Sequence, residues 1–321
     1  GPNKARTRNA DNSMTDISER PISELSKAFK SGELTPANAV DAALARIESH
    51  EAKLAAFEIV LADRARVAAE AATQAIASGH RIGPFHGVPF ALKDLVDVEG
   101  LVTTGGTEVR AHSVATKTAT IARRLIAAGG ILVGKTKTVE IAYGAWGTNQ
   151  VRGTPWNPWD AEVHRMPGGS SSGSGVAVAS RMAHCAVGTD TGGSVRIPAA
   201  VCGLTGLKVT EGRLPLDGIV PLSHTLDTPG PMARSVADAV IMFEVLDGRL
   251  PAATDADLAG GNGLFAAASA GVSGLALGVL TPAEREGIDA EVLEHYDAAL
   301  KRLEKLGATL TPFELPVPIE D

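Results

Sequence analysis

MPGGSSSGSGVAVASRMAHCAVGTDTGGSVRIP, residues 166–198, is the stretch of sequence that decides the fold. It begins with a run of serines and glycines and continues into GVAVASRM, which we predict to be a helix. CAVGT (185–189) follows as a predicted strand, then a Gly-rich turn, and then TGLKV (205–209) as the next strand. A helix between strands is typical of an α/β protein.

The same alternation of helices and strands extends over the rest of the chain. Thr35-Pro36 is a typical helix start, since Thr caps the first turn and Pro is favoured at the first helical position. We predict strands at residues 55–61, 88–92, 131–133, 275–280 and 308–315, and helices at 62–78, 118–128, 235–246 and 290–306. We therefore expect a sheet that is largely covered by helices.

Composition excludes several classes of protein. The net charge is −7 and the chain has only seven Phe, three Trp and two Tyr, whereas a general nucleic-acid binder needs a basic face and stacking rings. No apolar run approaches the roughly 18 residues of a membrane span, so we expect no membrane partner. Cys185 and Cys202 are too few for a disulfide scaffold or a Cys-rich zinc site. Their apolar surroundings predict buried thiols in a reducing, cytoplasmic compartment.

The first 14 residues, GPNKARTRNADNSM, stand apart from the predicted fold. They are basic, but no apolar stretch follows them, so we do not expect a signal peptide here. Gly1-Pro2 is typical of a protease-cleavage scar, and Met14 is the expected native start. We interpret residues 1–14 as an expression remnant or a disordered segment and expect a single domain over residues 15–321.

Two short patterns match catalytic motifs without their structural context. GGILVGKT (129–136) fits the P-loop expression, but its variable residues are branched and apolar and no strand precedes the first glycine. A buried strand is therefore expected there. Gly169 to Gly173 fits the nucleophile elbow G-x-S-x-G, which requires an apolar strand before it, and Pro167 would spoil such a strand. Taken alone, PGGSSSGSG favours a flexible linker.

A third pattern, GTDTGGSVRIP (188–198), follows a predicted strand directly. Gly192-Gly193 allow a sharp turn, and Ser194 stands at the start of the next helix. The N–H groups of Thr191, Gly192, Gly193 and Ser194 would then point together, as an oxyanion hole needs. The alternative is a plain Gly-rich turn with a Ser N-cap.

Three motifs, taken in order and spacing, closely resemble the core of the amidase signature family, the Ser-cisSer-Lys amide hydrolases. They are HGVPFALKDLVDV (86–98), MPGGSSSGSGVAVA (166–179) and GTDTGGSVRIPAAVCGLTGLK (188–208). The resemblance extends from about residue 21 to the last residues. It implies a mixed central β-sheet covered by helices on both faces. Family members continue beyond the strand that ATLTPFELPV (308–317) resembles, so the resemblance also implies a C-terminally incomplete domain.

The resemblance assigns roles to residues at the matching positions. It implies Ser194 as the nucleophile, Ser170 as the bridging serine after a cis peptide bond, and Lys93 as the base. Ser171 is expected to fix the loop by hydrogen bonding, and Asp190 and Arg196 to support the nucleophile. Ser172 stands where many members have glycine and others have serine. No cofactor and no metal are implied.

The chemistry of lysine sets a condition on this assignment. A serine hydroxyl is a weak nucleophile without a base, and a lysine is a base only when it is neutral. At a pKa of about 10.4, keeping it neutral at pH 7 costs about 4.6 kcal/mol, so Lys93 must be deeply buried. Asp94 would raise that pKa if it were close. As the next residue on a strand, Asp94 is expected to point to the opposite face.

The resemblance implies an amide hydrolase that cleaves a small carboxamide to a carboxylate and ammonia or an amine through an acyl-enzyme. The alternatives are a glutaminase subunit of a tRNA-dependent amidotransferase, which requires partner chains, and an inactive truncated member. The expected partner is a small-molecule amide, and a homodimer is one possible assembly. Tyr143, Trp146 and Trp156 are placed to line a pocket entrance, although a tryptophan in a Gly-rich loop is often a packing anchor.

Overall fold

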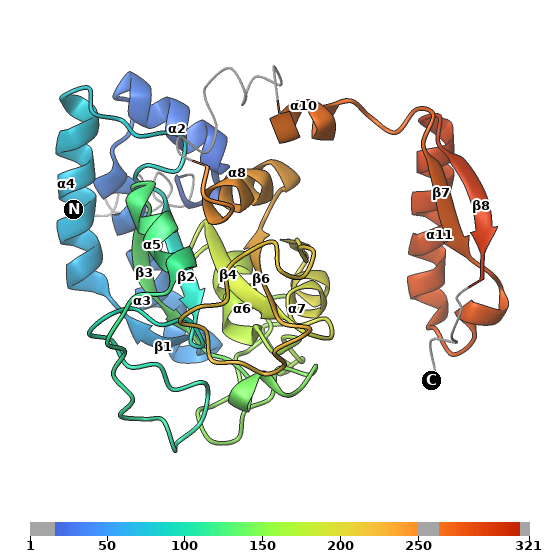
Figure 1. Cartoon of the computed structure of the whole chain (residues 1–321), viewed down its shortest axis with the longest axis horizontal. Helices are drawn as coiled ribbons and strands as arrows, with labels where there is room; N and C mark the ends of the chain where they lie inside the picture. Colours follow the sequence, from blue (N-terminus) through green and yellow to red (C-terminus); the bar gives the residue numbers. More distant parts are fainter. Residues whose placement is uncertain (1–16, 250–262, 315–321) are drawn as a thin grey trace, which may run out of the picture. The chain divides into compact units, whose positions relative to one another are not determined.

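A computed structural model describes residues 17–249 and 263–314 of the chain (Figure 1). The chain divides into two compact units, residues 1–258 and residues 259–321, which we describe separately. The predicted single domain over residues 15–321 stays a prediction. The remnant proposed at residues 1–14 lies outside the described residues.

The first unit is built on a six-stranded mixed sheet in the order β1-β3-β2-β4-β6-β5. β2 runs parallel to both β3 and β4, whereas β1 is antiparallel to β3, and β6 is antiparallel to β4 and β5. The strands are β1 (Phe57–Val60), β2 (Pro89–Lys93), β3 (Ile131–Thr136), β4 (Cys185–Asp190), β5 (Thr205–Gly206) and β6 (Thr228–Ala233). The expected mixed α/β fold is confirmed.

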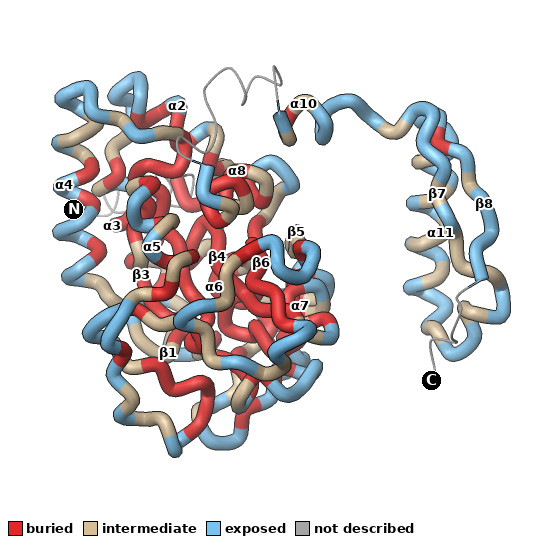
Figure 2. Tube along the Cα trace, viewed as in Figure 1, coloured by how far each residue is buried: buried red, intermediate tan, exposed pale blue. Residues whose placement is uncertain are grey.

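Helices flank this sheet, and the alternation of side chains along the strands explains how. Ala91 of β2 and Ala186 of β4 belong to one apolar cluster with Val176 of α6, whereas Cys185 lies on the alternate face of β4. The helices are α2 (Ile22–Ser31), α3 (Pro36–Leu54), α4 (Ala62–Ala77), α5 (Thr120–Ala127), α6 (Ser172–Ala179), α7 (Arg196–Val201) and α8 (Val236–Leu246), with a 3-10 turn, η1 (Glu140–Ala142). Figure 2 shows that burial is concentrated in the strands between them.

The Ser/Gly segment is part of the packed core, so its interpretation as a flexible linker is wrong. Every residue from 167 to 178 is buried. Gly173 shows why glycine is needed, since a Cβ there would lie 2.2 Å from the carbonyl oxygen of Ala56 and 2.5 Å from the amide nitrogen of Lys137. The segment GGILVGKT likewise forms the start of β3 rather than a P-loop.

β6 is a strand that the sequence does not predict, because its sequence TPGPMA contains Pro229 and Pro231. Proline has no N–H to donate and is normally confined to edges. Here β5 is only two residues long and pairs with Met232 and Ala233, so neither proline has to donate to β5. The predicted strand at 205–209 is correspondingly shorter than expected.

The second unit contains a parallel pair of strands, β7 (Ala276–Leu280) and β8 (Thr309–Phe313), connected through α11 (Ala290–Lys305). It also contains α10 (Gly263–Ser269) and a 3-10 turn, η2 (Ala283–Arg285). The strands and the long helix agree with the predicted elements at 275–280, 290–306 and 308–315.

Candidate active site

Lys93 is the last residue of β2 and points to the face of the sheet on which α6 packs. This follows from strand alternation, because Ala91, two residues earlier, belongs to the cluster that contains α6. The side chain of Lys93 is completely buried. Its Nζ lies 2.7 Å from Oγ of Ser170 and 2.8 Å from Oγ1 of Thr189. Two predicted site residues, far apart in the sequence, are therefore in direct contact.

The surroundings of Lys93 meet the condition that the sequence set for a base. Burial lowers the pKa of Lys93 from 10.5 to about 7, although the carboxylates of Asp190 and Asp227 act in the opposite direction. A neutral form of Lys93 is thus accessible near pH 7. Asp94 does not contribute to this balance, because its side chain faces Lys135, as its expected orientation requires.

The loop that carries Ser170 is held on both sides by hydrogen bonds. The Gly169–Ser170 peptide bond is cis, as the resemblance implies. The carbonyl oxygen of Ser170 accepts hydrogen bonds from the amide of Val139 and the hydroxyl of Thr138, both 3.1 Å long. Ser171 ties the loop to β4, since its Oγ donates to the carbonyl oxygen of Thr189 at 3.3 Å and accepts from its amide at 3.2 Å. Ser171 thus hydrogen-bonds the loop to β4 as both donor and acceptor, and its supporting role in the site stays a prediction.

Ser194 lies in the turn between β4 and α7 and borders the same loop. The amide of Ser171 donates to the carbonyl oxygen of Ser194 at 3.3 Å, which brings the two predicted serine motifs side by side. Asp190, buried at the end of β4, accepts from the amides of Gly193 at 2.8 Å and Val195 at 3.1 Å. Arg196 closes this arrangement with hydrogen bonds of 3.0 Å from Nε and Nη2 to the Asp190 carboxylate.

The hydrogen bond that the Gly193 amide makes corrects our expectation for the oxyanion hole. We expected four N–H groups to point together, but that of Gly193 is donated to Asp190. A buried carboxylate needs such donors, which explains why the turn supplies one to it. Within the described residues, the amides of Thr191, Gly192 and Ser194 have no backbone or side-chain acceptor, so these three remain as candidate oxyanion donors.

Two polar residues of this site were missed by the sequence analysis. Thr189 contacts Lys93 directly but lies in a predicted strand, where a threonine is unremarkable. Asp227 accepts hydrogen bonds from the hydroxyl of Thr191 at 2.5 Å and from the amide of Leu222 at 2.8 Å. It belongs to no motif, and its link to Thr191 spans 36 residues. Asp227 also borders a cavity of about 150 Å³.

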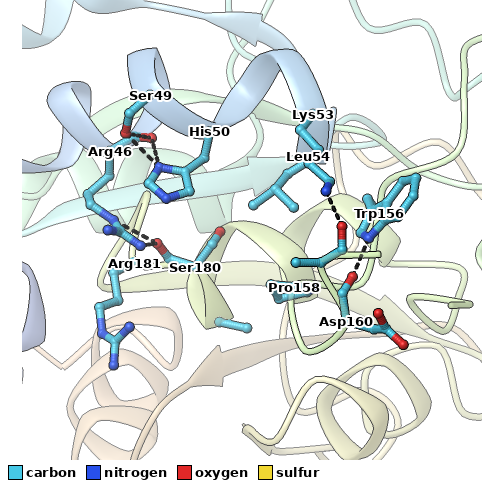
Figure 3. A pocket seen from close by; sticks show the side chains of 12 residues that line it. Arg46, Ser49, His50, Lys53, Leu54, Trp156, Pro158, Asp160, Ser180 and Arg181 are labelled. Carbon is cyan, nitrogen blue, oxygen red and sulfur yellow. Dashed lines mark hydrogen bonds between the residues drawn. The ribbon is translucent and has the colours of Figure 1, made fainter. Parts of the chain in front are cut away.

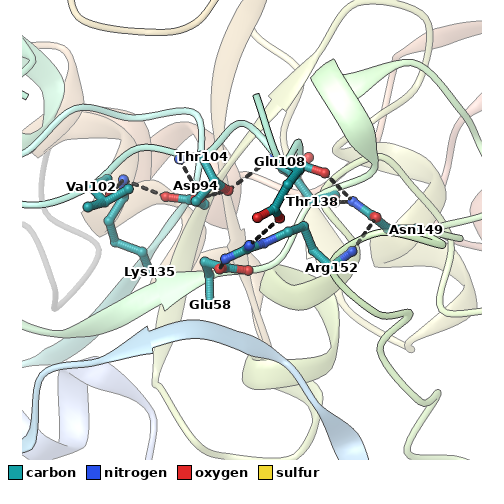
Figure 4. A network of polar contacts seen from close by, with 10 residues as sticks. Glu58, Asp94, Val102, Thr104, Glu108, Lys135, Thr138, Asn149 and Arg152 are labelled. Atoms are coloured by element: carbon teal, nitrogen blue, oxygen red, sulfur yellow. Dashed lines mark hydrogen bonds and ion pairs between the residues drawn. The ribbon is translucent and has the colours of Figure 1, made fainter. Parts of the chain in front are cut away.

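A buried polar network holds the end of β2 from its other side (Figure 4). Asp94 Oδ1 lies 2.5 Å from Nζ of Lys135, and Asp94 Oδ2 accepts from the amide of Thr104 at 2.9 Å. Lys135 also donates to the Thr103 hydroxyl at 2.7 Å. The lysine of the rejected P-loop pattern thus binds the residue that follows Lys93 and fixes where β2 ends.

The three aromatic residues proposed for a pocket entrance lie in two different parts of the structure. The segment that contains Tyr143 and Trp146 packs on the Ser170 loop, because the amide of Gly169 donates to the carbonyl oxygen of Ala145 at 2.6 Å. Tyr143 and Trp146 are 83% and 66% exposed, and their role at an entrance stays a prediction. Trp156 instead lies beside α3, where its Nε1 donates to the carbonyl oxygen of Asp160 at 2.5 Å.

Neither a metal cluster nor a membrane-spanning helix is found within residues 17–249 and 263–314. No group of three or more His, Cys, Asp or Glu side chains there could hold a metal ion. No helix of those ranges is long and apolar enough to cross a membrane. Cys185 and Cys202 are free and buried, and burial raises the pKa of the Cys202 thiol to about 12.

Comparison with protein families gives a match over most of the chain. The model of the family described as amidase matches residues 38–320. A subunit of the glutamyl-tRNA(Gln) amidotransferase from Streptomyces coelicolor is 38% identical over 304 residues, which cover 94% of this chain and 61% of that protein. A 2-amino-5-chloromuconic acid deaminase from Comamonas testosteroni is 39% identical over 295 residues, 92% of this chain and 62% of that protein. The chain thus spans about 60% of the length of these curated relatives.

Solved structures give the same relationship. The native peptide amidase from Stenotrophomonas maltophilia superposes with a TM-score of 0.81 and 33% identity, covering 93% of this chain and 62% of that one. The corresponding glutamyl-tRNA(Gln) amidotransferase subunit from Thermotoga maritima superposes with a TM-score of 0.75 and 29% identity, covering 94% and 62%.

Proposed function

This chain belongs to the amidase family, and we propose that it hydrolyses a small carboxamide to a carboxylate and ammonia or an amine. In this proposal Ser194 is the nucleophile, Ser170 relays the proton and Lys93 is the base. The observation that carries it is the contact of 2.7 Å between the buried Nζ of Lys93 and Oγ of Ser170, beside the turn of Ser194.

The pKa of Lys93, about 7, supports its role as base. A neutral amine keeps two N–H groups and gains a lone pair. It can donate to Thr189 while it accepts the proton of Ser170. Ser170 in turn accepts the proton of Ser194 as that oxygen attacks the carbonyl carbon. When the C–N bond breaks, the proton returns from Lys93 through Ser170 to the leaving nitrogen, and water then attacks the acyl-enzyme.

The turn before α7 is proposed to stabilise the negative charge that develops on the carbonyl oxygen of the substrate. The amides of Thr191, Gly192 and Ser194 are the proposed donors, and such donors typically contribute about 3–4 kcal/mol each to the transition state. Asp190 and Asp227 keep the turn in place through Gly193 and Thr191. Because both carboxylates are already bonded to this turn, we assign them to positioning rather than to proton transfer.

The test is to replace each serine and measure ammonia release from a panel of small aliphatic and aromatic amides. Ser194→Ala is expected to abolish hydrolysis and labelling by a fluorophosphonate, whereas Ser170→Ala keeps a small residual activity. Ser78→Ala, an exposed serine at the end of α4, is the matched control and should hydrolyse at the wild-type rate. Near wild-type hydrolysis by Ser194→Ala would contradict the assignment.

A second candidate is the glutaminase subunit of a tRNA-dependent amidotransferase, which the names of several relatives favour. In that case ammonia is released from glutamine, and two further chains should co-purify with this one. A free-standing hydrolase would be isolated without them. An inactive member would fail to react with the fluorophosphonate at Ser194.

The proposal also covers the cellular location, the pocket entrance, the domain and the partners of the enzyme. We place it in the cytoplasm, which the two unpaired, buried thiols support. Tyr143 and Trp146 are assigned to the entrance of the substrate pocket, and residues 15–321 to one amidase-signature domain. A homodimer and a small-molecule amide are its proposed partners.

A further inference from the structure

A separate pocket lies beside the C-terminal half of α3, and its lining includes none of Lys93, Ser170 and Ser194 (Figure 3). Its volume is about 290 Å³, just below the range of about 300–1,000 Å³ that is typical of small-molecule sites. α3 contributes Arg46, Ser49, His50 and Lys53, whose spacing places them on one face of the helix. This face of α3 forms one wall of the pocket.

Positive charge dominates the lining of the pocket. Arg46, Lys53 and Arg181 line it, and Asp160 is the acidic residue among the described lining residues. Asp160 also pairs with Arg165, whose Nε lies 3.0 Å from its Oδ2, so part of its charge is offset outside the pocket cations. In Figure 3 Arg46 and Arg181 lie at one end of the pocket and Lys53 at the other.

The cations are held mainly by neutral acceptors. Arg46 donates from Nε and Nη2 to the carbonyl oxygen of Ser180 at 3.2 and 3.1 Å, and Lys53 donates to that of Ala161. Within the described residues neither one forms an ion pair with a carboxylate. Both therefore retain charge that an anion could neutralise.

Arg181 adds to the excess of positive charge at one end of the pocket. Its guanidinium lies 3.3 Å from Glu19, a carboxylate that is half exposed, so this ion pair is weak. The pKa of Arg46 is lowered by burial and by the charge of Arg181, although Glu19 acts against this. The two guanidiniums lie at the same end of the pocket, where the charge of Arg181 acts on Arg46 and Glu19 offsets part of that charge.

The backbone of Arg181 is a second, independent indication. Its φ is 62°, in the left-handed region that costs a non-glycine residue about 1–2 kcal/mol. It follows α6 at a position where helices commonly end in glycine. An arginine at such a position costs stability. A binding role for its guanidinium would account for this cost.

We propose that this pocket binds a small organic anion through a carboxylate or phosphate group held by Arg46 and Arg181. The planar, forked guanidinium matches either group with two parallel hydrogen bonds. The remainder of the ligand lies against Leu54 and Pro158 and reaches towards Lys53, which also lies 4.8 Å from the ring centroid of Trp156. This site is distinct from the proposed hydrolytic site and does not depend on it.

The test is a titration of the 321-residue protein with inorganic phosphate and, separately, with glutarate. Binding is followed by calorimetry and by intrinsic tryptophan fluorescence, to which Trp156 contributes, with potassium chloride at equal ionic strength as the baseline. Arg181→Gly is the informative variant, because glycine suits the left-handed backbone and the fold should be retained. Arg64→Gln, which removes an exposed guanidinium from α4, is the matched control.

We expect saturable binding of at least one probe, weakened about tenfold or more in Arg181→Gly and unchanged in Arg64→Gln. Tighter binding of glutarate would identify a carboxylate ligand, and tighter binding of phosphate a phosphorylated one. Binding should persist in Ser194→Ala, so the outcome does not depend on hydrolysis. The proposal is overturned if neither probe binds above the chloride baseline, or if Arg181→Gly binds as tightly as the wild type.

Discussion

Replacing the proposed base by an apolar residue should stabilise the protein while it abolishes hydrolysis. In Lys93→Met an adaptable side chain of similar length fills the same buried site without a charge to desolvate. The folded protein binds a proton on Lys93 with a pKa of about 7, whereas the unfolded chain binds it near 10.5. Between these pH values the unfolded state holds one more proton, so the stability of the wild type rises with pH.

The size of the effect follows from this difference in pKa. At pH 7 the buried lysine lowers the free energy of unfolding by about 4 kcal/mol, and at pH 9 by about 2 kcal/mol. Lys93→Met also loses the hydrogen bonds to Ser170 and Thr189, at about 1 kcal/mol each. We therefore expect Lys93→Met to be more stable than the wild type by about 2 kcal/mol at pH 7, an advantage that vanishes near pH 9.

The measurement is urea unfolding of both proteins at pH 7, 8 and 9, followed by tryptophan fluorescence. Lys117→Met is the control, because Lys117 is exposed and its replacement should give the same small change at every pH. The pH dependence is more decisive than the absolute value, since the lost hydrogen bonds affect all three measurements alike. If the difference between Lys93→Met and the wild type were constant from pH 7 to 9, Lys93 would not titrate in this range and its role as base would fail.

Three further changes test the packing and charges around the site. Gly173→Ala should destabilise the protein by about 1–3 kcal/mol, because its Cβ would lie 2.2 Å from a backbone carbonyl oxygen; an unchanged melting temperature would contradict this. Asp190→Asn removes a charge that raises the pKa of Lys93, so the midpoint of the pH–rate profile should move to lower pH. A shift of the midpoint to higher pH would show that the Asp190 carboxylate does not raise the pKa of Lys93. Lys135→Met leaves Asp94 buried without its cation and should cost about 3–5 kcal/mol in urea unfolding, and adding Asp94→Asn should recover part of it.

The sequence predicted the elements that carry the proposed site because their signals are local. The apolar run before Lys93 and the run CAVGT before the Gly-Gly-Ser turn have the length and composition of buried strands, and both form strands. The orientation of Asp94 followed from strand alternation alone. The rejection of the P-loop pattern rested on branched residues next to Lys135, and those residues belong to β3.

The errors and omissions arise where a residue's partner is distant in sequence. The two prolines of β6 argued against a strand, and only the shortness of β5 makes them tolerable. Asp227 carried no signal, because its contact with Thr191 exists only after β4 and β6 pair. The Gly193 amide was expected to face a substrate, but the buried Asp190 needs a donor and takes it.

The sequence by itself determined most of the helices and strands, though not β6, because composition and periodicity are local properties. The resemblance of three motifs implied the family and the residues proposed for catalysis. Only the tertiary structure decided that Lys93 is fully buried and lies 2.7 Å from Ser170, and thus that its pKa falls to about 7. It also decided that Arg46, Lys53 and Arg181 surround one cavity. Desolvation and charge interactions depend on distances in space, and residues separated by many positions in the chain acquire those distances only when it folds.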